Sequence, residues 1–414
     1  MSRERLNILF LAPFAPSPAT FGAQRRVEGL MAALGRRHEI SVVSVVPDDH
    51  DARASERAMR EYCKEVVLVS RPGSSWEGAG KRLLQVRSLL SSRSLVRGLY
   101  ELRSVREVLD RLLSTRPYDI VNVELPFLAS SRLAKSPSGT RAPRLVLDEH
   151  NVEFDLARQQ TGNERGFARR LYNAINWRKI RREEMKIWSE FDGVAFCSAA
   201  DQARALSLVP SLRSAVVPNA VDIEYFKPLP THPPSDGCTV MFFGAINYFP
   251  NQDGLLYFLQ EVWPSIAKSN PKARLKIIGQ HPTPEILAHR GPRIEVAGKV
   301  DDLRPHLASA AVSIAPLRIG GGTRFKILET MAMARPVVST SLGAEGIDAE
   351  PGRHLLLGDD AASFAAAVSR VLSDPQLGSR LGREGRGLVE ERYSWASAAQ
   401  ILEGLYRRAL TSAP

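Results

Sequence analysis

Three consecutive glycines, Gly320–Gly322, stand directly before two cations, Arg324 and Lys326, and a carboxylate, Glu329. The apolar residues 311–317 precede this segment and the apolar residues 336–340 follow it, so the pattern predicts strand, glycine loop, helix and strand. A glycine loop that leads into a helix directs backbone N–H groups at a phosphate, and glycine has no Cβ to keep a diphosphate away. The segment therefore predicts a diphosphate site.

The side chains on this predicted helix suit the same ligand. Arg324 and Lys326 would add positive charge where the helix dipole already favours an anion. Glu329 lies further along the helix and could accept hydrogen bonds from sugar hydroxyls. The simpler interpretation is a tight turn followed by a helix on which Glu329 is solvated. The flanking strands favour the binding site.

A second polar group, Asp148, Glu149 and His150, follows the apolar residues 145–147. Ligands of doubly wound sheets bind at the carboxyl ends of strands, which makes His150 a candidate site residue. A neutral imidazole could donate or accept a hydrogen bond there, and a protonated one would assist a leaving group. The alternative is a helix-capping cluster in which His150 is merely packed.

Short apolar runs alternate with helical patterns along the whole chain, which predicts an α/β fold with parallel sheets. A segment rich in proline, residues 228–237, separates two sets of runs. We expect two Rossmann-like domains, 1–225 and 226–395, that face a cleft, and a final helix in 396–414 that returns to the first domain. Residues 81–113 read as two amphipathic helices broken near Ser91. The expected strands are 8–12, 40–46, 66–69, 120–123, 145–147, 193–197, 215–217, 240–244, 275–279, 294–297, 312–315 and 337–340.

Composition fits an ordinary globular chain of two domains, with 414 residues, 44% hydrophobic and 24% charged. No apolar run is long enough to span a bilayer, and three widely spaced cysteines predict reduced thiols in a cytoplasmic protein. The net charge is +11, and residues 1–225 hold 35 of the 56 Lys and Arg residues. A basic first domain could bind an anionic membrane surface, whereas nothing in the sequence resembles a nucleic-acid-binding motif.

Several motifs in order resemble the family 4 retaining glycosyltransferases of the GT-B fold. They are Gly22-Ala23-Gln24-Arg25-Arg26 after the first strand, Pro218-Asn219-Ala220-Val221-Asp222 between the domains, Phe242-Phe243-Gly244 at the start of the second domain, the glycine loop, and Tyr393-Ser394-Trp395 near the end. The form of the glycine loop is similar to that of a bacterial subgroup tied to exopolysaccharide assembly.

The resemblance implies a metal-independent transfer of a hexose from a UDP- or GDP-sugar to an acceptor hydroxyl, without a further cofactor. His150 would lie beside the transferred sugar, and Glu329 would bind the ribose. Two departures from the family pattern stand out. Gly321 occupies the place of a first motif glutamate, and the uncharged Ala245 and Asn251 stand where many relatives carry Arg and Lys. We therefore expect Arg324 and Lys326 to neutralise the diphosphate instead.

The expected site divides into catalytic and donor-binding positions, with no metal ligands. We expect His150, Arg324 and Lys326 to take part in catalysis. The expected donor-binding residues are Gly22, Ala23, Gly244, Asn251, Gly279, Val300, Gly320, Gly321, Gly322, Thr323 and Glu329. The acidic stretch at residues 48–51 lies in a polar loop after a strand, and we discount it as a metal site. A lipid-linked saccharide is the leading acceptor, on the inner face of the membrane, and a small molecule is the alternative.

Other protein classes fit less well. A UDP-sugar 2-epimerase shares the architecture and the diphosphate chemistry, and Gly321 leaves room for a catalytically silent subunit that only binds donor. No Gly-x-Gly-x-x-Gly follows an expected strand, which argues against a nicotinamide oxidoreductase. No Gly-x-x-x-x-Gly-Lys-Ser/Thr segment is present, which argues against a P-loop ATPase.

Overall fold

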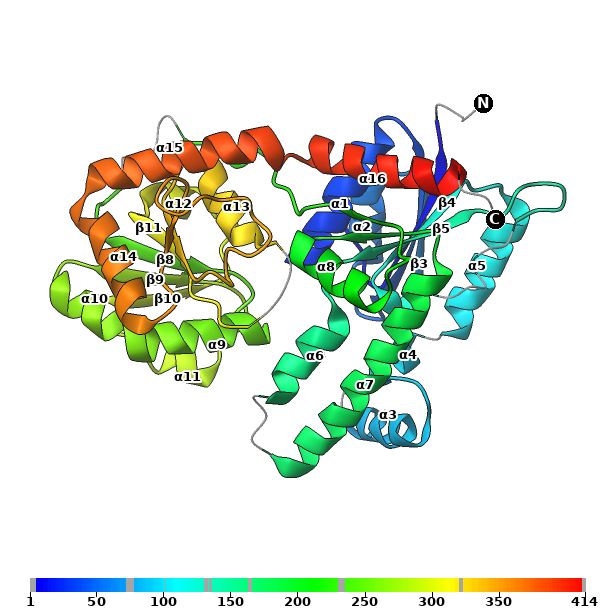
Figure 1. Cartoon of the computed structure of the whole chain (residues 1–414), viewed down its shortest axis with the longest axis horizontal. Helices are drawn as coiled ribbons and strands as arrows, with labels where there is room; N and C mark the ends of the chain where they lie inside the picture. Colours follow the sequence, from blue (N-terminus) through cyan, green and yellow to red (C-terminus); the bar gives the residue numbers. More distant parts are fainter. Residues whose placement is uncertain are drawn as a thin grey trace. The chain divides into compact units, whose positions relative to one another are not determined.

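The computed structural model describes the main chain of residues 5–71, 78–100, 102–129, 133, 136–162, 166–229, 235–319 and 323–411, and side chains throughout these ranges except at 78–83. The chain divides into two compact units, and Figure 1 colours the whole chain by its sequence. Unit 1 comprises Met1–Val217 and Ala398–Pro414, and unit 2 comprises Pro218–Ser397. None of the described helices is long and apolar enough to cross a membrane.

Unit 1 is built on a seven-stranded sheet in which every neighbouring pair of strands is parallel. The strand order is β3-β2-β1-β4-β5-β6-β7. Helices cover both faces, so the strands are buried on both sides and consist of almost uninterrupted apolar residues. The strands are β1 (Asn7–Ala12), β2 (Glu39–Pro47), β3 (Glu65–Arg71), β4 (Ile120–Glu124), β5 (Arg144–Glu149), β6 (Gly193–Phe196) and β7 (Ser214–Val216).

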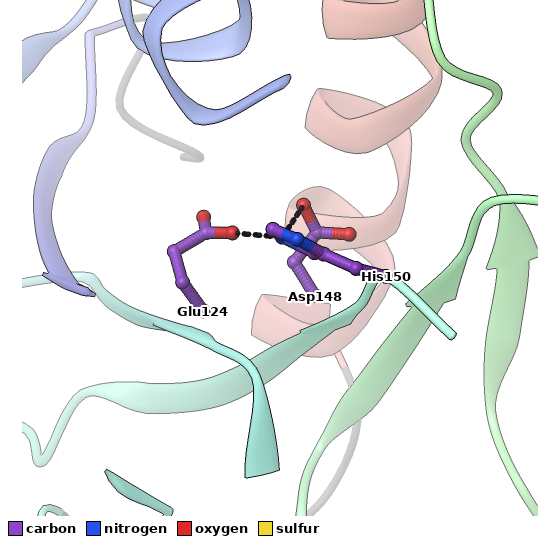
Figure 2. A group of neighbouring side chains, drawn as sticks. All are labelled: Glu124, Asp148 and His150. Atoms are coloured by element: carbon purple, nitrogen blue, oxygen red, sulfur yellow. Dashed lines mark hydrogen bonds and ion pairs between the residues drawn. The ribbon is translucent and has the colours of Figure 1, made fainter. Parts of the chain in front are cut away.

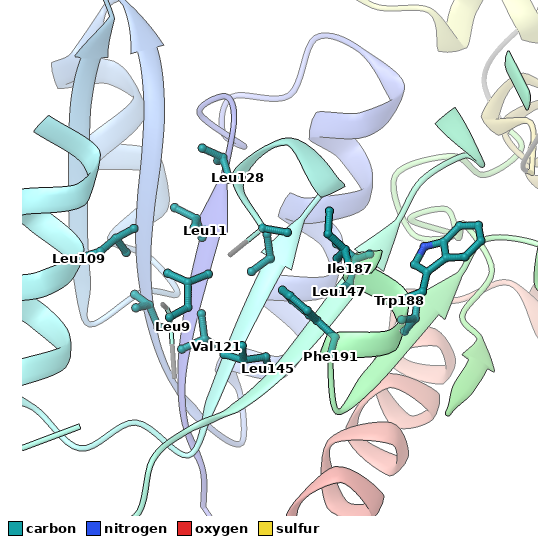
Figure 3. Close-up of a cluster of buried hydrophobic side chains, with 14 of the residues drawn as sticks. Leu9, Leu11, Leu109, Val121, Leu128, Leu145, Leu147, Ile187, Trp188 and Phe191 are labelled. Carbon is teal, nitrogen blue, oxygen red and sulfur yellow. The ribbon is translucent and has the colours of Figure 1, made fainter. Parts of the chain in front are cut away.

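The core of unit 1 forms where alternate strand residues meet helices (Figure 3). Leu9 of β1 and Leu147 of β5 are fully buried in it, and Trp188 of α7 packs edge-on against Phe196 of β6. The helices are α1 (Gly22–Gly35), α2 (Ala52–Met59), α3 (Gly78–Leu90), α4 (Leu95–Tyr100), α5 (Arg103–Thr115), α6 (Glu153–Gly162), α7 (Phe167–Glu190), α8 (Ala199–Leu208) and α16 (Trp395–Thr411), with a 3-10 turn at Pro126–Leu128.

The expectation of two helices in residues 81–113 was wrong, because the segment from α3 to α5 contains three. The break near Ser91 is present, but α4 ends at Tyr100 and a separate helix, α5, begins at Arg103. The short α4 packs against the 3-10 turn, with Tyr100 stacked on Phe127 at 5.9 Å between ring centroids. A six-residue helix has too few turns to leave a clear periodic signal in the sequence.

Unit 2 contains a six-stranded parallel sheet with the order β10-β9-β8-β11-β12-β13. The expected runs agree with the first five strands to within a residue or two. The two-residue edge strand β13 was not expected, since two apolar residues carry no recognisable period. The strands are β8 (Thr239–Phe243), β9 (Arg274–Ile278), β10 (Ile294–Gly298), β11 (Val312–Ala315), β12 (Val337–Ser339) and β13 (Leu356–Leu357).

The helices of unit 2 bury their apolar faces on this sheet in two clusters, one on each side. Asp360 caps α14 in a reciprocal capping box with Ser363, and Asp374 caps α15. The helices are α9 (Phe249–Tyr257), a π-helical turn (Phe258–Val262), α10 (Trp263–Ser269), α11 (Pro284–Leu287), α12 (Arg304–Ser309), α13 (Phe325–Ala332), α14 (Ala361–Ser373) and α15 (Pro375–Arg392).

Both sheets have a point at which the strand order reverses. In unit 1 it lies between β1 and β4, and in unit 2 between β8 and β11. The loops that leave the carboxyl ends of such a strand pair diverge to opposite faces of the sheet and leave a crevice where ligands of doubly wound folds bind. The polar residues at these two places are therefore the candidates for function. The α/β prediction, with a parallel sheet in each half of the chain, is confirmed.

Candidate active site

At the strand reversal of unit 1, a guanidinium and a carboxylate are completely buried together. Arg26 of α1 donates from Nε and Nη2 to the two oxygens of Asp148 at the end of β5, at 2.8 and 2.6 Å. Burial alone would lower the pKa of Arg26 and raise that of Asp148. The pair reverses both effects and keeps both groups charged. Arg26 also donates to the carbonyl of Val217 at 2.9 Å, so it fastens α1 to two strand ends.

His150 faces a carboxyl group from the adjacent strand (Figure 2). Its Nε2 lies 2.8 Å from Oε2 of Glu124, the last residue of β4, and 3.8 Å from Asp148 Oδ2. Its Nδ1 is buried and has no hydrogen-bond partner among the described residues. Burial is the main reason that the pKa of His150 falls to about 4, with Asp148 acting in the opposite direction. The imidazole is therefore neutral near pH 7. This favours a role in which it donates or accepts a hydrogen bond over one in which it is protonated and assists a leaving group.

A second contact holds the Glu124 carboxyl group from the other side. Asn122 donates from Nδ2 to Glu124 Oε1 at 2.7 Å, and the Tyr406 hydroxyl of α16 donates to Asn122 Oδ1 at 2.9 Å. Burial, and then the nearby charge of Asp148, raises the pKa of Glu124 well above its usual value. Glu124 and His150 Nε2 therefore share a proton, and the position of this proton decides whether Nδ1 donates or accepts.

Glu124, Asp148 and His150 are the one group among the described residues with the types and proximity of metal ligands, their atoms lying within 4.8 Å of one another. The group fits a cation poorly, because Arg26 already occupies both oxygens of Asp148 and supplies a full positive charge beside them. In the discounted acidic loop, Asp51 instead caps α2 by accepting from Ala54 N at 3.0 Å.

A second set of buried acids lies next to His150 in the chain. Glu184 of α7 accepts from the backbone N–H groups of Glu153 and Phe154 at 2.8 and 2.7 Å, which caps the start of α6. The carboxyl group of Glu149 lies close enough to affect that of Glu184, and it accepts from Trp188 Nε1 at 3.3 Å. Burial raises the pKa of Glu184 to about 8, and burial followed by the charge of Glu184 raises the pKa of Glu149 above its usual value. This network is structural, since it fixes the helix that follows His150.

The predicted donor residues Gly22 and Ala23 are the first two residues of α1. The N-terminal residue before them, Phe21, provides no side-chain cap, and Arg26 follows Gly22 by one helical turn. The contact of Arg26 with Asp148 thus ties the beginning of α1 to the strand end that carries His150.

At the strand reversal of unit 2, Lys326 is a half-buried cation whose hydrogen-bond partner is uncharged. Its ammonium donates to Asn251 Oδ1 of α9 at 2.8 Å and lies 4.1 Å from the centre of the Phe242 ring. Burial, and then repulsion by Arg324, lowers its pKa to about 7. Asn251 donates in turn to the carbonyl of Ala245 at 2.9 Å. Asn251 stands where many relatives carry a cationic side chain. In this structure its amide oxygen instead accepts a hydrogen bond from Lys326 of α13.

The two glycines at the ends of β8 and β9 are needed for close backbone packing. Gly244 has φ +140°, and a Cβ there would lie 3.2 Å from Asn251 Nδ2 and 3.4 Å from Lys326 Nζ. A Cβ on Gly279 would lie 1.9 Å from the Gly244 carbonyl oxygen, a distance at which no side chain fits. Gly244, Gly279, Asn251 and Lys326 are thus brought together, as the expected site requires.

The other predicted positions of unit 2 surround the start of α13. Arg324 is the N-cap residue, and Thr323 is buried, with its carbonyl accepting from Asn219 Nδ2 at 2.8 Å. Glu329 lies in the second turn of the helix and is 2% exposed. Val300 packs half-buried in the loop after β10. Gly320, Gly321 and Gly322 lie outside the described residues.

Sequence reasoning missed the partners that hold these residues. Glu124 was not considered, although an acid at the carboxyl end of a strand next to β5 was a visible signal. Arg26 was noted only as part of a motif, and its contact with Asp148, 122 residues away, has no signature in the sequence. The pairing of Asn251 with Lys326 likewise depends on the fold.

Two family descriptions match this chain. Residues 21–225 match "Glycosyltransferase Family 4", and residues 237–374 match "Glycosyl transferases group 1". The two matches lie one after the other and together account for most of the sequence.

Two curated relatives are similar in sequence. An "Uncharacterized 44.6 kDa protein in cps region" of Klebsiella pneumoniae is 24% identical over 377 residues, which is 87% of this chain and 90% of that protein. An "MMP alpha-(1->4)-mannosyltransferase" of Mycolicibacterium hassiacum is 32% identical over 114 residues, which is 27% of each chain.

Solved structures share the fold at low sequence identity. Sucrose-phosphate synthase of Thermosynechococcus elongatus has a TM-score of 0.69 and 17% identity, over 98% of this chain and all of that one. The Anabaena protein HepE in complex with UDP has a TM-score of 0.65 and 16% identity, over 97% of this chain and all of that one.

Proposed function

This chain belongs to the family 4 glycosyltransferases, and from that premise we propose that it moves a hexose from a UDP- or GDP-sugar to an acceptor hydroxyl with retention of configuration. The observation that carries the proposal is Lys326, a desolvated cation whose side chain binds an amide rather than a carboxylate at the strand reversal of unit 2. A diphosphate would supply the negative charge that this ammonium lacks, and the cation would stabilise the charge of the departing diphosphate. HepE, with a similar fold, was solved with UDP, which supports the same ligand class.

Arg324 and the glycine loop complete the proposed diphosphate site. Arg324 precedes α13 and acts on the pKa of Lys326 through its charge, so both cations are close to the same helix N-terminus. The dipole of α13 adds to their effect. Glu329 would accept from the ribose, and Gly244 and Gly279 leave room for the backbone to approach the ligand.

In unit 1 we assign the contact with the transferred sugar to His150. Its Nδ1 is a buried nitrogen without a partner among the described residues, and a bound sugar or phosphate would supply the missing hydrogen bond. Glu124 fixes the ring through Nε2 and sets the tautomer. No carboxylate nucleophile is needed if the acceptor attacks on the face from which the diphosphate leaves, with a donor phosphate oxygen taking the proton of the attacking hydroxyl.

We also propose that the reaction needs no metal, because Lys326 and Arg324 provide the positive charge that a cation would otherwise bring. The relative from a cps region supports an acceptor in polysaccharide or glycoconjugate synthesis, such as a lipid-linked saccharide. An enzyme acting on such an acceptor would work in the cytoplasm at the inner face of the membrane.

The test combines donor binding with product analysis. UDP- and GDP-sugars are screened for thermal stabilisation, where a ligand at 100 times its dissociation constant adds about 2.7 kcal/mol. The stabilising sugar is then incubated alone and with saccharide acceptors in chelator, and the anomeric configuration of the product is read by NMR. We expect a retained glycoside whose formation is abolished by His150→Ala and strongly reduced by Lys326→Met. The matched variant Lys268→Met, at the exposed end of α10, should behave as the parent.

Other outcomes identify the rival functions. An epimerised nucleotide sugar formed without acceptor would mean a 2-epimerase. Stabilisation by donor without transfer to any acceptor would mean a silent donor-binding subunit. Loss of all turnover in chelator, restored by a divalent metal, would contradict the metal-independent mechanism.

A further inference from the structure

Exposed apolar side chains gather on two neighbouring helices of unit 1. In the part of the chain that the structure describes, most of the large apolar residues of α3 and α7 that do not reach the core are well exposed. Phe167 is 83% exposed and Leu90 is 88% exposed, values that a stable fold has no reason to favour. We call this set the apolar face; its members are Val86, Leu89 and Leu90 of α3 and Phe167, Leu171 and Ile175 of α7.

The length of α7 explains why this face lies outside the core. Its 24 residues span about 36 Å, whereas the six residues of β5 span about 20 Å. The residues of α7 that are buried, Ile180, Glu184, Ile187 and Trp188, all belong to its second half. The first half extends away from the sheet, with α3 beside it (Figure 1). Ser88 Oγ of α3 contacts the Tyr172 hydroxyl at 3.0 Å, which joins the two helices into one surface.

Arginines continue the same stripe along α7. Phe167, Leu171 and Ile175 are spaced by four residues, and Arg178 and Arg182 follow at the next two turns, so all five lie on one side of the helix. Arg178, Arg181 and Met185 line, with Arg182, a shallow hollow of about 260 Å³. Apolar face and arginines together form what we call the apolar–basic surface.

These arginines are held in place without being neutralised. Arg182 donates to the carbonyl of Ser92, Arg178 stacks on Trp177 at 4.6 Å, and Arg181 lies over the Phe154 ring at 6.0 Å. No carboxylate of the described residues forms an ion pair with any of the three. The acids of the same stretch of helix are engaged elsewhere, since Glu183 accepts from Ser94 N and Glu184 caps α6. The hollow therefore keeps three positive charges for an external anion.

We propose that the apolar–basic surface docks on a bilayer that contains anionic lipid. The apolar face enters the interface, and Arg178, Arg181 and Arg182 bind headgroup phosphates. An anionic bilayer matches both parts of the surface, because it offers acyl chains for the apolar side chains and negative charge for the arginines. A second copy of the chain would bring three arginines against three others, and the net charge of +11 adds to this repulsion.

The proposal is tested by co-sedimentation with vesicles, without any donor or acceptor present. The parent protein should bind vesicles of phosphatidylcholine with about one third phosphatidylglycerol, and bind pure phosphatidylcholine far less. Replacing Arg178, Arg181 and Arg182 by Gln should weaken binding to the mixed vesicles by roughly a hundredfold, at about fivefold for each cation. Replacing Phe167, Leu171 and Ile175 by Ser should abolish the binding that persists in high salt. All six changes are at surface positions, so the thermal midpoint and UDP binding should stay as in the parent.

A matched charge control separates this surface from net charge alone. Arg370, Arg380 and Arg383 are exposed arginines of unit 2, and their change to Gln removes the same three charges. This variant should bind the mixed vesicles as the parent does. The proposal is overturned if the two arginine-to-glutamine variants lose vesicle affinity equally. It is also overturned if neither the glutamine nor the serine variant of the apolar–basic surface weakens vesicle binding. A parent that is dimeric by light scattering and becomes monomeric in the serine variant would make a second copy the occupant and also overturn it.

Discussion

The charged groups at the two strand reversals are treated in opposite ways. In unit 1 the charged guanidinium of Arg26 is paired with the carboxylate of Asp148, and the neutral imidazole of His150 hydrogen bonds to Glu124. In unit 2 the half-buried ammonium of Lys326 lies against an amide and an aromatic ring, without a carboxylate partner. In unit 1 the charge of Arg26 is neutralised by Asp148 within the fold. In unit 2 the charge of Lys326 has no carboxylate partner, and its desolvation lowers the stability of the unliganded protein.

Under the proposed function, this difference separates a part that keeps its shape from a part that binds the diphosphate. A buried ion pair contributes little net stability, but breaking it leaves an uncompensated charge. A buried lone cation lowers the stability of the unliganded protein, and a bound diphosphate recovers that free energy as affinity. The two regions should therefore respond in opposite directions when a charge is removed.

The largest effect is expected on the free energy of unfolding when the buried carboxylate of Asp148 in unit 1 is removed. Asp148→Asn should lower the free energy of unfolding by about 3–5 kcal/mol, because the Arg26 guanidinium remains buried without a counter-charge. Urea titration measures this loss. The double change Arg26→Met with Asp148→Leu should recover most of it, since apolar side chains can replace a buried ion pair. A loss below about 1 kcal/mol in the single variant would show that water reaches the guanidinium.

Removing the cation of unit 2 should act on binding instead of stability. Lys326→Met should weaken the affinity for UDP or GDP by roughly ten- to a hundredfold, since a charge-assisted hydrogen bond contributes about 1.5–3 kcal/mol. The same change should leave the unliganded protein at least as stable, because it removes a desolvated amine. Calorimetric titration and urea unfolding measure the two quantities, with Lys268→Met as the control. A destabilised variant with unchanged nucleotide affinity would reverse the comparison.

The pH dependence of nucleotide binding sharpens the same point. The pKa of Lys326 in the free protein is about 7, and a bound diphosphate favours the charged form and raises it. Binding therefore takes up a proton, and affinity should fall by up to about tenfold per pH unit as the pH rises from 7 to 9. Lys326→Arg keeps its charge over this range and should flatten the slope. A parent whose affinity is constant from pH 7 to 9 would exclude the ammonium as the group that binds the anion.

The smallest effect is expected at the neighbouring carboxyl groups of Glu149 and Glu184. Because the pKa of Glu184 is raised to about 8 in the folded state, its contribution to stability is present below the unfolded value of about 4.5 and is lost as the pH rises through 8. Glu149→Gln supplies an amide donor to Glu184 and should reduce that loss, raising the thermal midpoint at pH 8 by about 2 °C. The exposed Glu261→Gln serves as the control. An equal midpoint shift at pH 5 would point to a packing change.

The architecture was accessible from the sequence because parallel strands buried on both faces leave continuous apolar runs, and the twelve expected runs correspond to β1 through β12. The position of candidate residues at strand ends was accessible for the same reason, as with His150 after β5. The contacts that decide their chemistry were not. Glu124 and Asn251 became informative only when the order of strands put them beside His150 and Lys326, and pKa values depend on burial that no local pattern reveals. The roles of Arg324, Glu329 and the glycine loop stay predictions.

The last helix has a consequence for how the chain is made. Residues 398–411 belong to unit 1, yet the ribosome supplies them after all of unit 2, and Tyr406, Leu402 and Leu405 are essentially fully buried there. Until then, the first 217 residues leave the surface that α16 covers exposed, and Asn122 lacks its hydroxyl partner. Residues 218–397, in contrast, form one continuous stretch that can fold without any later segment.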